Sequence, residues 1–292
     1  MNKFLLNFFR LTRPLSNVKN IAIVSLAFYL SGLKLNSALF VLGALSLSFI
    51  FSATYAYNTL CDINTDKKNE NKKHYLKAVQ YFGEKKSLLI SAVLCGLGLV
   101  FGYFVNIYFF ITLFFLLLVG FLYSSEYTRF KERVLLDVLF GASLTFLLRF
   151  VASWFIFEIS FPPLLPMFAL VFLKNGGYML YKGYDRPHLI KSKIKNSITA
   201  LPEKTTLIIS ACFFVASIVL FILMCLNSIY LRLGILGYLS IDFLALLILF
   251  IPPIIVQYLL FLNKIKIKPR YVRAAGLISL LLVIIIVLII QR

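Results

Sequence analysis

Residues 37–59 read SALFVLGALSLSFIFSATYAYNT, a run without a single charged side chain. About 20 mostly apolar residues are enough for a helix to cross a bilayer, and a helix satisfies its own backbone hydrogen bonds there. Similar runs recur along the chain: 61% of the 292 residues are hydrophobic and only 14% are charged. The sequence therefore predicts an all-α, polytopic membrane protein.

The apolar runs predict about nine transmembrane helices in one bundle, which makes residues 1–292 a single integral membrane domain. We find no tract that would form a separate soluble domain. The expected spans are 19–34, 37–59, 86–104, 107–124, 134–157, 162–181, 204–226, 236–262 and 271–290.

The basic residues predict how the helices are oriented. All but five of the 30 Lys and Arg residues lie in or beside the N-terminal segment and the loops after spans two, four, six and eight. By the positive-inside rule these segments are cytoplasmic, so we expect a multi-pass protein of the inner membrane with a cytoplasmic N-terminus. The net charge of +19 then reflects topology and contact with membrane lipids, and it indicates no nucleic-acid partner.

Two of these loops, residues 60–85 and 182–203, are long and crowded with basic and polar side chains. The loops on the other side are short. Because functional residues concentrate on loops held by a rigid scaffold, we expect the two long loops to form the cap of an active site facing the cytoplasm.

A row of oxygen ligands leads from the second span into the first long loop. Residues 52–66 read SATYAYNTLCDINTD, so Asn58, Asp62 and Asp66 recur every four residues. On a continuous helix this spacing places all three on one face. Mg²⁺ is often held by one or two carboxylates together with water and phosphate oxygens, and basic residues follow within the loop. We therefore predict a magnesium site, with ordinary polar residues at a helix end as the alternative.

The Asn58–Asp62–Asp66 row resembles the first aspartate-rich motif of the UbiA-type intramembrane prenyltransferase superfamily. Residues 12–20, TRPLSNVKN, are similar to the start of the first span in its polyprenyl-phosphate (decaprenyl-phosphate) phosphoribosyltransferase branch. Residues 135–149 resemble that branch's fifth span, an apolar helix with one deep arginine. This resemblance implies a Mg²⁺-dependent transferase of cell-envelope biosynthesis that moves a phosphoribosyl group from phosphoribosyl diphosphate to a polyprenyl phosphate.

The resemblance also implies roles for individual residues. Asn58, Asp62 and Asp66 would hold the metal, and Asp62, Asp66 and Arg149 would be catalytic. Arg149 lies inside a span, where a charge is costly and needs a partner or a function; Asp242 or a helix-end carbonyl is the structural alternative. The residues expected to bind substrate phosphates are Lys19, Lys72, Lys73, Lys77, Lys131, Lys182, Tyr184 and Lys191.

Two departures from the family motifs keep other functions open. Thr59 stands where the first motif has its leading aspartate, and residues 182–186, KGYDR, match neither the KRYAE nor the DxxxD form of the second motif. One alternative is transfer of a polyprenyl group from its diphosphate to a small acceptor. Another is a catalytically degenerate protein that binds or transports lipids. The lipid length, the cosubstrate and the oligomeric state, a homo-oligomer included, stay open.

Overall fold

The computed structural model describes residues 2–34, 36–67, 72–227, 255 and 258–259 of the chain. In this part all regular secondary structure is helical. Six helices are long and apolar enough to cross a membrane. They are α3 (Ser37–Cys61), α6 (Glu84–Val105), α7 (Ile107–Ser124), the span Leu136–Phe155, α10 (Leu164–Tyr184) and α13 (Glu203–Leu226).

These six spans agree with six of the nine predicted ones to within a few residues. The predicted span 19–34 corresponds to α2 (Val18–Ser31), which is only 14 residues long. It ends early because Gly32 takes the left-handed conformation, at φ 65°, that commonly terminates a helix. The two remaining predictions, 236–262 and 271–290, fall almost entirely outside the described residues.

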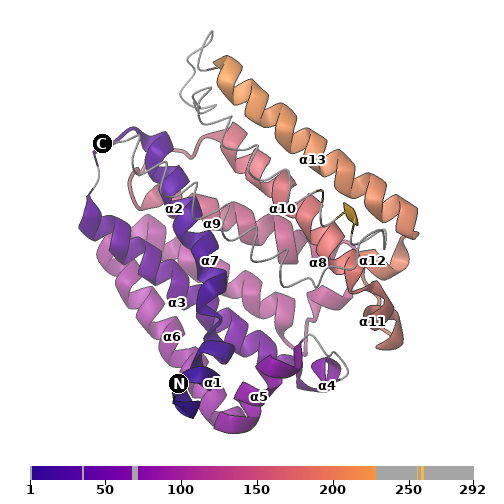
Figure 1. The fold of residues 1–292 in the computed structure, drawn as a ribbon. Coiled ribbons are helices and arrows are strands. Elements are labelled where there is room, and N and C mark those ends of the chain that lie inside the picture. The colour runs from indigo at the N-terminus through magenta and orange to yellow at the C-terminus, as the bar shows by residue number, and fades with distance from the viewer. Residues whose placement is uncertain (1, 35, 68–71, 228–254, 256–257, 260–292) are drawn as a thin grey trace.

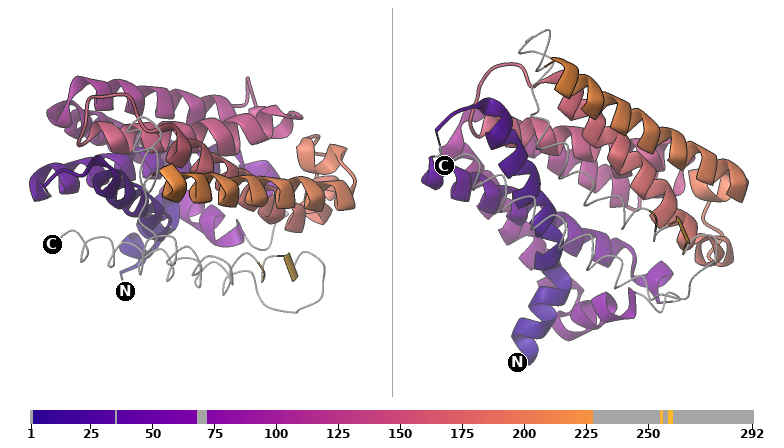
Figure 2. Two further views of the ribbon diagram at one scale, coloured as in Figure 1. Left: turned by 90° about the horizontal axis from the view of Figure 1, so that it is seen from above. Right: turned by 45° about the horizontal axis from the view of Figure 1, so that its top comes forward.

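The long helices pack side by side into one bundle (Figure 1). One apolar cluster joins α2, α3 and α7 to α9 (Leu144–Phe155), and a second joins α2 and α9 to α10 and α13. Both views in Figure 2 show α10 and α13 lying along each other. Close approach of α3 and α6 depends on Gly98, where a Cβ atom would come within 2.7 Å of the Ile50 side chain. Small residues of this kind commonly allow membrane helices to pack closely.

The span Leu136–Phe155 is irregular at its start. It comprises α8 (Leu136–Val138), a π-helical turn η4 (Leu139–Ser143) and then α9. Gly141 lies in the π-turn, where a Cβ atom would come within 2.6 Å of the Tyr123 ring. A π-turn of this kind is frequent at functional sites. Here the absence of a side chain at Gly141 leaves room for the ring of Tyr123, which comes from α7.

Short helices gather at one end of the bundle, which we call the loop end (Figure 1). The first long loop forms α4 (Ile63–Asp66) and α5 (Lys73–Phe82), and the second forms α11 (Arg186–Lys191) and α12 (Ser197–Ala200). The chain begins nearby with α1 (Lys3–Thr12), which the sequence analysis did not predict. Because Phe4, Leu5 and Phe9 of α1 are exposed, this helix suits the interface between lipid and water.

Candidate active site

A polar pocket opens at the loop end. Three separate parts of the chain line it: the segment after α3, the segment between α7 and α8, and the segment from the end of α10 to α12. The pocket is lined by Asp62, Thr65, Asp66, Lys72, Lys131, Glu132, Lys182, Asp185, His188, Leu189, Ile194 and Asn196. Both loops predicted to cap an active site therefore contribute to one pocket.

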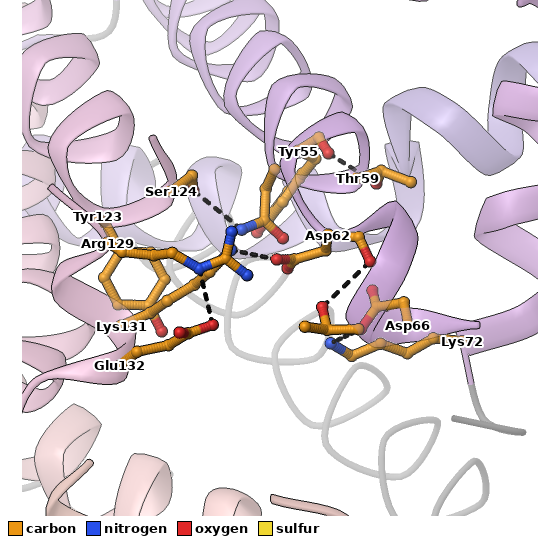
Figure 3. Close-up of polar contacts among 12 residues, drawn as sticks. Tyr55, Thr59, Asp62, Asp66, Lys72, Tyr123, Ser124, Arg129, Lys131 and Glu132 are labelled. Carbon is orange, nitrogen blue, oxygen red and sulfur yellow. Dashed lines mark hydrogen bonds and ion pairs between the residues drawn. The ribbon is translucent and has the colours of Figure 1, made fainter. Parts of the chain in front are cut away.

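The first wall carries two buried carboxylates, Asp62 and Asp66 (Figure 3). The helix does not continue through them as the spacing suggested, because α3 ends at Cys61 and Asp62 caps it with φ −101° and ψ 7°. The short helix α4 then returns Asp66 to the same pocket. Lys72 pairs with Asp66 at 2.8 Å. Burial raises the pKa of Asp66, and the charge of Lys72 opposes that rise.

The second wall is the short segment between α7 and α8. Its backbone is bracketed by two non-glycine residues with positive φ, Arg129 at 46° and Leu135 at 67°. Such conformations are uncommon and persist only where the surrounding structure enforces them. They direct Lys131 into the pocket, where it forms a buried ion pair with Asp62, while Arg129 holds Glu132 at 2.8 Å (Figure 3).

The third wall runs from the end of α10 to α12 and is held by a buried carboxylate, Asp137 of α8. Asp137 accepts hydrogen bonds from the backbone N–H and the hydroxyl of Ser197. The Tyr178 hydroxyl of α10 donates to the same carboxylate at 3.4 Å. The Ser197 hydroxyl also accepts a 2.8 Å bond from the N–H of Leu135, which ties the second wall to the third.

Asn58 is not among the residues that line the pocket with the two aspartates. The Asn58 amide donates to the Ser124 hydroxyl of α7 at 2.9 Å. Its role as a metal ligand therefore stays a prediction, which would require this side chain to turn. The Asn58 side chain bonds to Ser124 although the 3.0 Å bond from the Asp62 N–H to the Asn58 carbonyl keeps the helical spacing of the backbone.

Thr59 occupies the position at which the family motif has its leading aspartate. It is fully buried and lies outside the pocket lining. Its hydroxyl donates to the Tyr55 carbonyl at 2.9 Å and accepts a 2.8 Å bond from the guanidinium of Arg13. Arg13 also stacks on the Tyr75 ring, 3.7 Å from its centroid. A carboxylate at position 59 would therefore pair with the guanidinium of Arg13 and would not be directed at a metal in the pocket.

This geometry predicts the result of substitutions at position 59. Thr59→Asp should form an ion pair with Arg13 and leave the affinity for Mg²⁺ unchanged. Thr59→Val should destabilise the fold by about 1 kcal/mol because Arg13 loses an acceptor. Calorimetric titration with Mg²⁺ and thermal unfolding in detergent measure the two effects. Thr112→Val is the matched control, since the Thr112 hydroxyl donates to a carbonyl of its own helix. Tighter Mg²⁺ binding by Thr59→Asp would contradict this interpretation.

The other predicted phosphate-binding residues are distributed unevenly. Lys72, Lys131 and Lys182 line the pocket. The remaining five are exposed and lie outside its lining, on α2, α5, α10 and α11: Lys19, Lys73, Lys77, Tyr184 and Lys191. Arg149, predicted to be catalytic, lies inside the bundle away from the pocket, and its suggested partner Asp242 is outside the described residues.

Several pocket residues were missed by the sequence analysis, among them Glu132, His188 and Asn196. Glu132 lies next to Lys131 in a short loop that contains no motif. His188 has no second histidine or cysteine at a metal-binding spacing, so its sequence context does not mark it. A search for any polar residue in the two long loops would have found His188 and Asn196, but not which way they point.

The donor set fits a magnesium ion that is shared with a phosphorylated ligand. Within the described ranges 2–67 and 72–227, with residue 35 excepted, no three Asp, Glu, His or Cys side chains are grouped closely enough to hold a metal alone. Mg²⁺ needs fewer protein ligands, because it usually keeps several waters and takes phosphate oxygens beside one or two carboxylates. Asp62 and Asp66 supply those carboxylates, and Lys72, Lys131 and Lys182 supply positive charge for phosphates.

Comparison with known proteins identifies the fold and the family. The sequence model of the UbiA prenyltransferase family matches residues 21–273. The chain belongs to the UbiA prenyltransferase family. A search of curated proteins gives no match. A solved UbiA homologue from Archaeoglobus fulgidus, bound to DMAPP and Mg²⁺, is 19% identical with a TM-score of 0.76, and the match covers 98% of this chain and 99% of that one.

Two further solved structures extend this similarity. The apo structure of a UbiA homologue from Aeropyrum pernix K1 is 17% identical with a TM-score of 0.74, covering 94% of this chain and 98% of the other. A digeranylgeranylglyceryl phosphate synthase structure is 20% identical with a TM-score of 0.67, covering 97% and 98%. The predictions of a multi-pass membrane protein and of the UbiA superfamily are thus confirmed. The predicted cofactor agrees with the Mg²⁺ bound in the Archaeoglobus homologue.

Proposed function

We propose that this UbiA-family protein is a Mg²⁺-dependent transferase that moves a phosphoribosyl group from phosphoribosyl diphosphate to a polyprenyl phosphate at the cytoplasmic face of the inner membrane. The observation that carries this proposal is the asymmetry of the pocket. Its first wall has two buried carboxylates, whereas the third wall has Lys182, His188 and Asn196 with a single carboxylate, Asp185. That composition suits one metal ion and a ligand with several phosphate oxygens.

In this mechanism the chain's residues act on the leaving diphosphate. Mg²⁺, held by Asp62 and Asp66, would neutralise the charge that develops on that group. Lys131 and Lys72, which pair with these two carboxylates in the structure, lie close enough to turn toward phosphate oxygens. An oxygen of the lipid phosphate attacks the anomeric carbon, the bond from that carbon to the diphosphate oxygen breaks, and diphosphate leaves with the electron pair.

A second candidate is transfer of a prenyl group from a prenyl diphosphate to a small acceptor. The observation that favours it is the similarity to the Archaeoglobus homologue, whose structures contain DMAPP or GPP with Mg²⁺. Against it stands the third wall, which has one Asp in the segment 182–203. A diphosphate held by two metals would require a second carboxylate group there.

A labelling experiment separates the candidates. We expect purified protein in detergent, given Mg²⁺, labelled phosphoribosyl diphosphate and a polyprenyl monophosphate, to produce a labelled lipid on extraction, and EDTA to abolish this product. The parallel reaction contains labelled geranyl diphosphate and an aromatic acceptor such as hydroxybenzoate. Product from the second mixture alone would overturn the phosphoribosyl proposal in favour of prenyl transfer. Product from neither mixture would favour a protein that binds or transports lipids.

A further inference from the structure

Two cations lie in membrane-spanning helices outside the pocket described above, a buried Arg149 and a half-buried Lys174. Lys174 is ten residues from each end of α10, and therefore about 15 Å along the helix from either end. Arg149 of α9 is buried, with 5% of its surface exposed. Neither side chain lines the pocket. Both are at a depth where charged residues are costly and typically mark a path or a site for substrate.

The surroundings of the two cations provide no opposite charge within the part of the chain that the structure describes. The Arg149 guanidinium lies over the Phe51 ring, 3.8 Å from its centroid, and the Arg149 Nε has no hydrogen-bond partner. Lys174 forms no ion pair with a described residue. The charges that act on it come from Lys19, Arg149 and Lys182, all of them positive.

Like charges that repel one another inside an apolar bundle destabilise it, and an apolar residue at either position would not. An anionic ligand removes this repulsion, because each cation then gains a charge-assisted hydrogen bond where water is scarce. Arg149 has one polar neutral partner, the Tyr55 side chain, and its other named neighbours are apolar: Phe146 stacks on Arg149, and Phe150, Leu147 and Leu170 belong to the adjoining core cluster. A ligand with an anionic head and an apolar body fits both features.

A face of α10 connects these cations to the pocket. Lys174, Tyr178 and Lys182 recur every four residues and so lie along one side of the helix. Lys182 lines the pocket, and Lys174 is about 12 Å farther into the bundle. About two turns of helix separate the two lysines along this face. Lys182 in the pocket and Lys174 farther into the bundle therefore suit two different anionic groups.

We propose that Arg149 and Lys174 form a second anion site, which binds the phosphate headgroup of the isoprenoid lipid from the membrane side. This assignment rests on the proposed function, in which the pocket binds the diphosphate of the other substrate. Arg149 and Lys174 would then determine that the protein recognises the phosphorylated form of the lipid. A lipid alcohol with the same chain would lack the group that the two cations recognise.

The test is a binding titration in detergent with farnesyl monophosphate, using wild type, Arg149→Met and Lys174→Met. Each substitution should weaken binding about tenfold or more, since each removes a charged hydrogen bond. Lys174→Arg should retain most of the affinity. Lys86→Met, which removes an exposed lysine of α6, is the matched control and should bind as wild type does. Farnesol has the apolar chain without the phosphate, and inorganic phosphate has the anion without the chain. Both should bind weakly to all variants.

Two results would refute the proposal that Arg149 and Lys174 form a second anion site, which we call the deep site. One is unchanged affinity of Arg149→Met and Lys174→Met for farnesyl monophosphate when thermal unfolding shows both variants to be folded. The other is equally tight binding of inorganic phosphate, which would identify a water-borne anion as the ligand. Binding of Mg²⁺ with inorganic diphosphate, measured on the same samples, tests the pocket separately. Its absence in wild type would refute the proposed function and leave the farnesyl monophosphate result to decide the deep site.

Discussion

Replacing Asp66 or Asp62 by Asn should lower the rate of Mg²⁺-dependent transfer by about 100-fold or more. Removal of one preorganised electrostatic contact to a developing charge commonly has an effect of this size. Both carboxylates are buried in the pocket wall, and in the structure a lysine balances each of them. Asparagine keeps the shape of the side chain but removes the charge that holds a divalent cation. The measurement is the rate of labelled-lipid formation at saturating Mg²⁺, together with calorimetric titration of Mg²⁺.

Controls distinguish a lost ligand from a damaged fold. Asp62→Asn leaves the buried amine of Lys131 without its partner, so this variant should also be less stable. Combining it with Lys131→Met removes the unpaired charge and should recover stability without recovering transfer. Asn64→Ala changes an exposed residue between the two aspartates and should transfer at the wild-type rate. Near-normal transfer by Asp66→Asn would show that this carboxylate does not serve the metal.

Asp137→Ala should destabilise the protein by about 2–3 kcal/mol and loosen the third wall of the pocket. The change removes the acceptor for two groups of Ser197 and for the Tyr178 hydroxyl, and buried donors left without acceptors are costly. Thermal unfolding in detergent measures the first effect. Amide hydrogen exchange across residues 186–200 measures the second, because this segment carries His188 and Asn196 into the pocket.

Two further variants isolate the role of the Asp137 charge. Asp137→Asn keeps an acceptor oxygen and should be less destabilising than Asp137→Ala. Ser192→Ala is a matched control in the same segment. The Ser192 hydroxyl lies 3.5 Å from His188 Nε2, a long distance at which a hydrogen bond is weak. If hydrogen exchange of Asp137→Ala across 186–200 matched the wild type, the carboxylate would not be the anchor of this wall.

The sequence by itself determined the membrane class and most span positions. A span is a local property, because about 20 consecutive apolar residues are sufficient and their neighbours in space hardly matter. For this reason the predicted span 107–124 coincides with α7, and five other predicted spans agree with helices within a few residues. The same locality placed Asp62 and Asp66 beside each other, since they are four residues apart and both follow α3.

Only the tertiary structure decided which side chains share the site. Lys131 meets Asp62 across 69 positions of sequence, and Ser197 meets Asp137 across 60. Such contacts depend on how the helices are rotated and where their ends bend, which side-chain packing between helices sets. Asn58 donates to Ser124 of α7, and the Thr59 hydroxyl accepts a bond from Arg13. A motif read along one segment cannot show these partners, because they come from other segments of the chain.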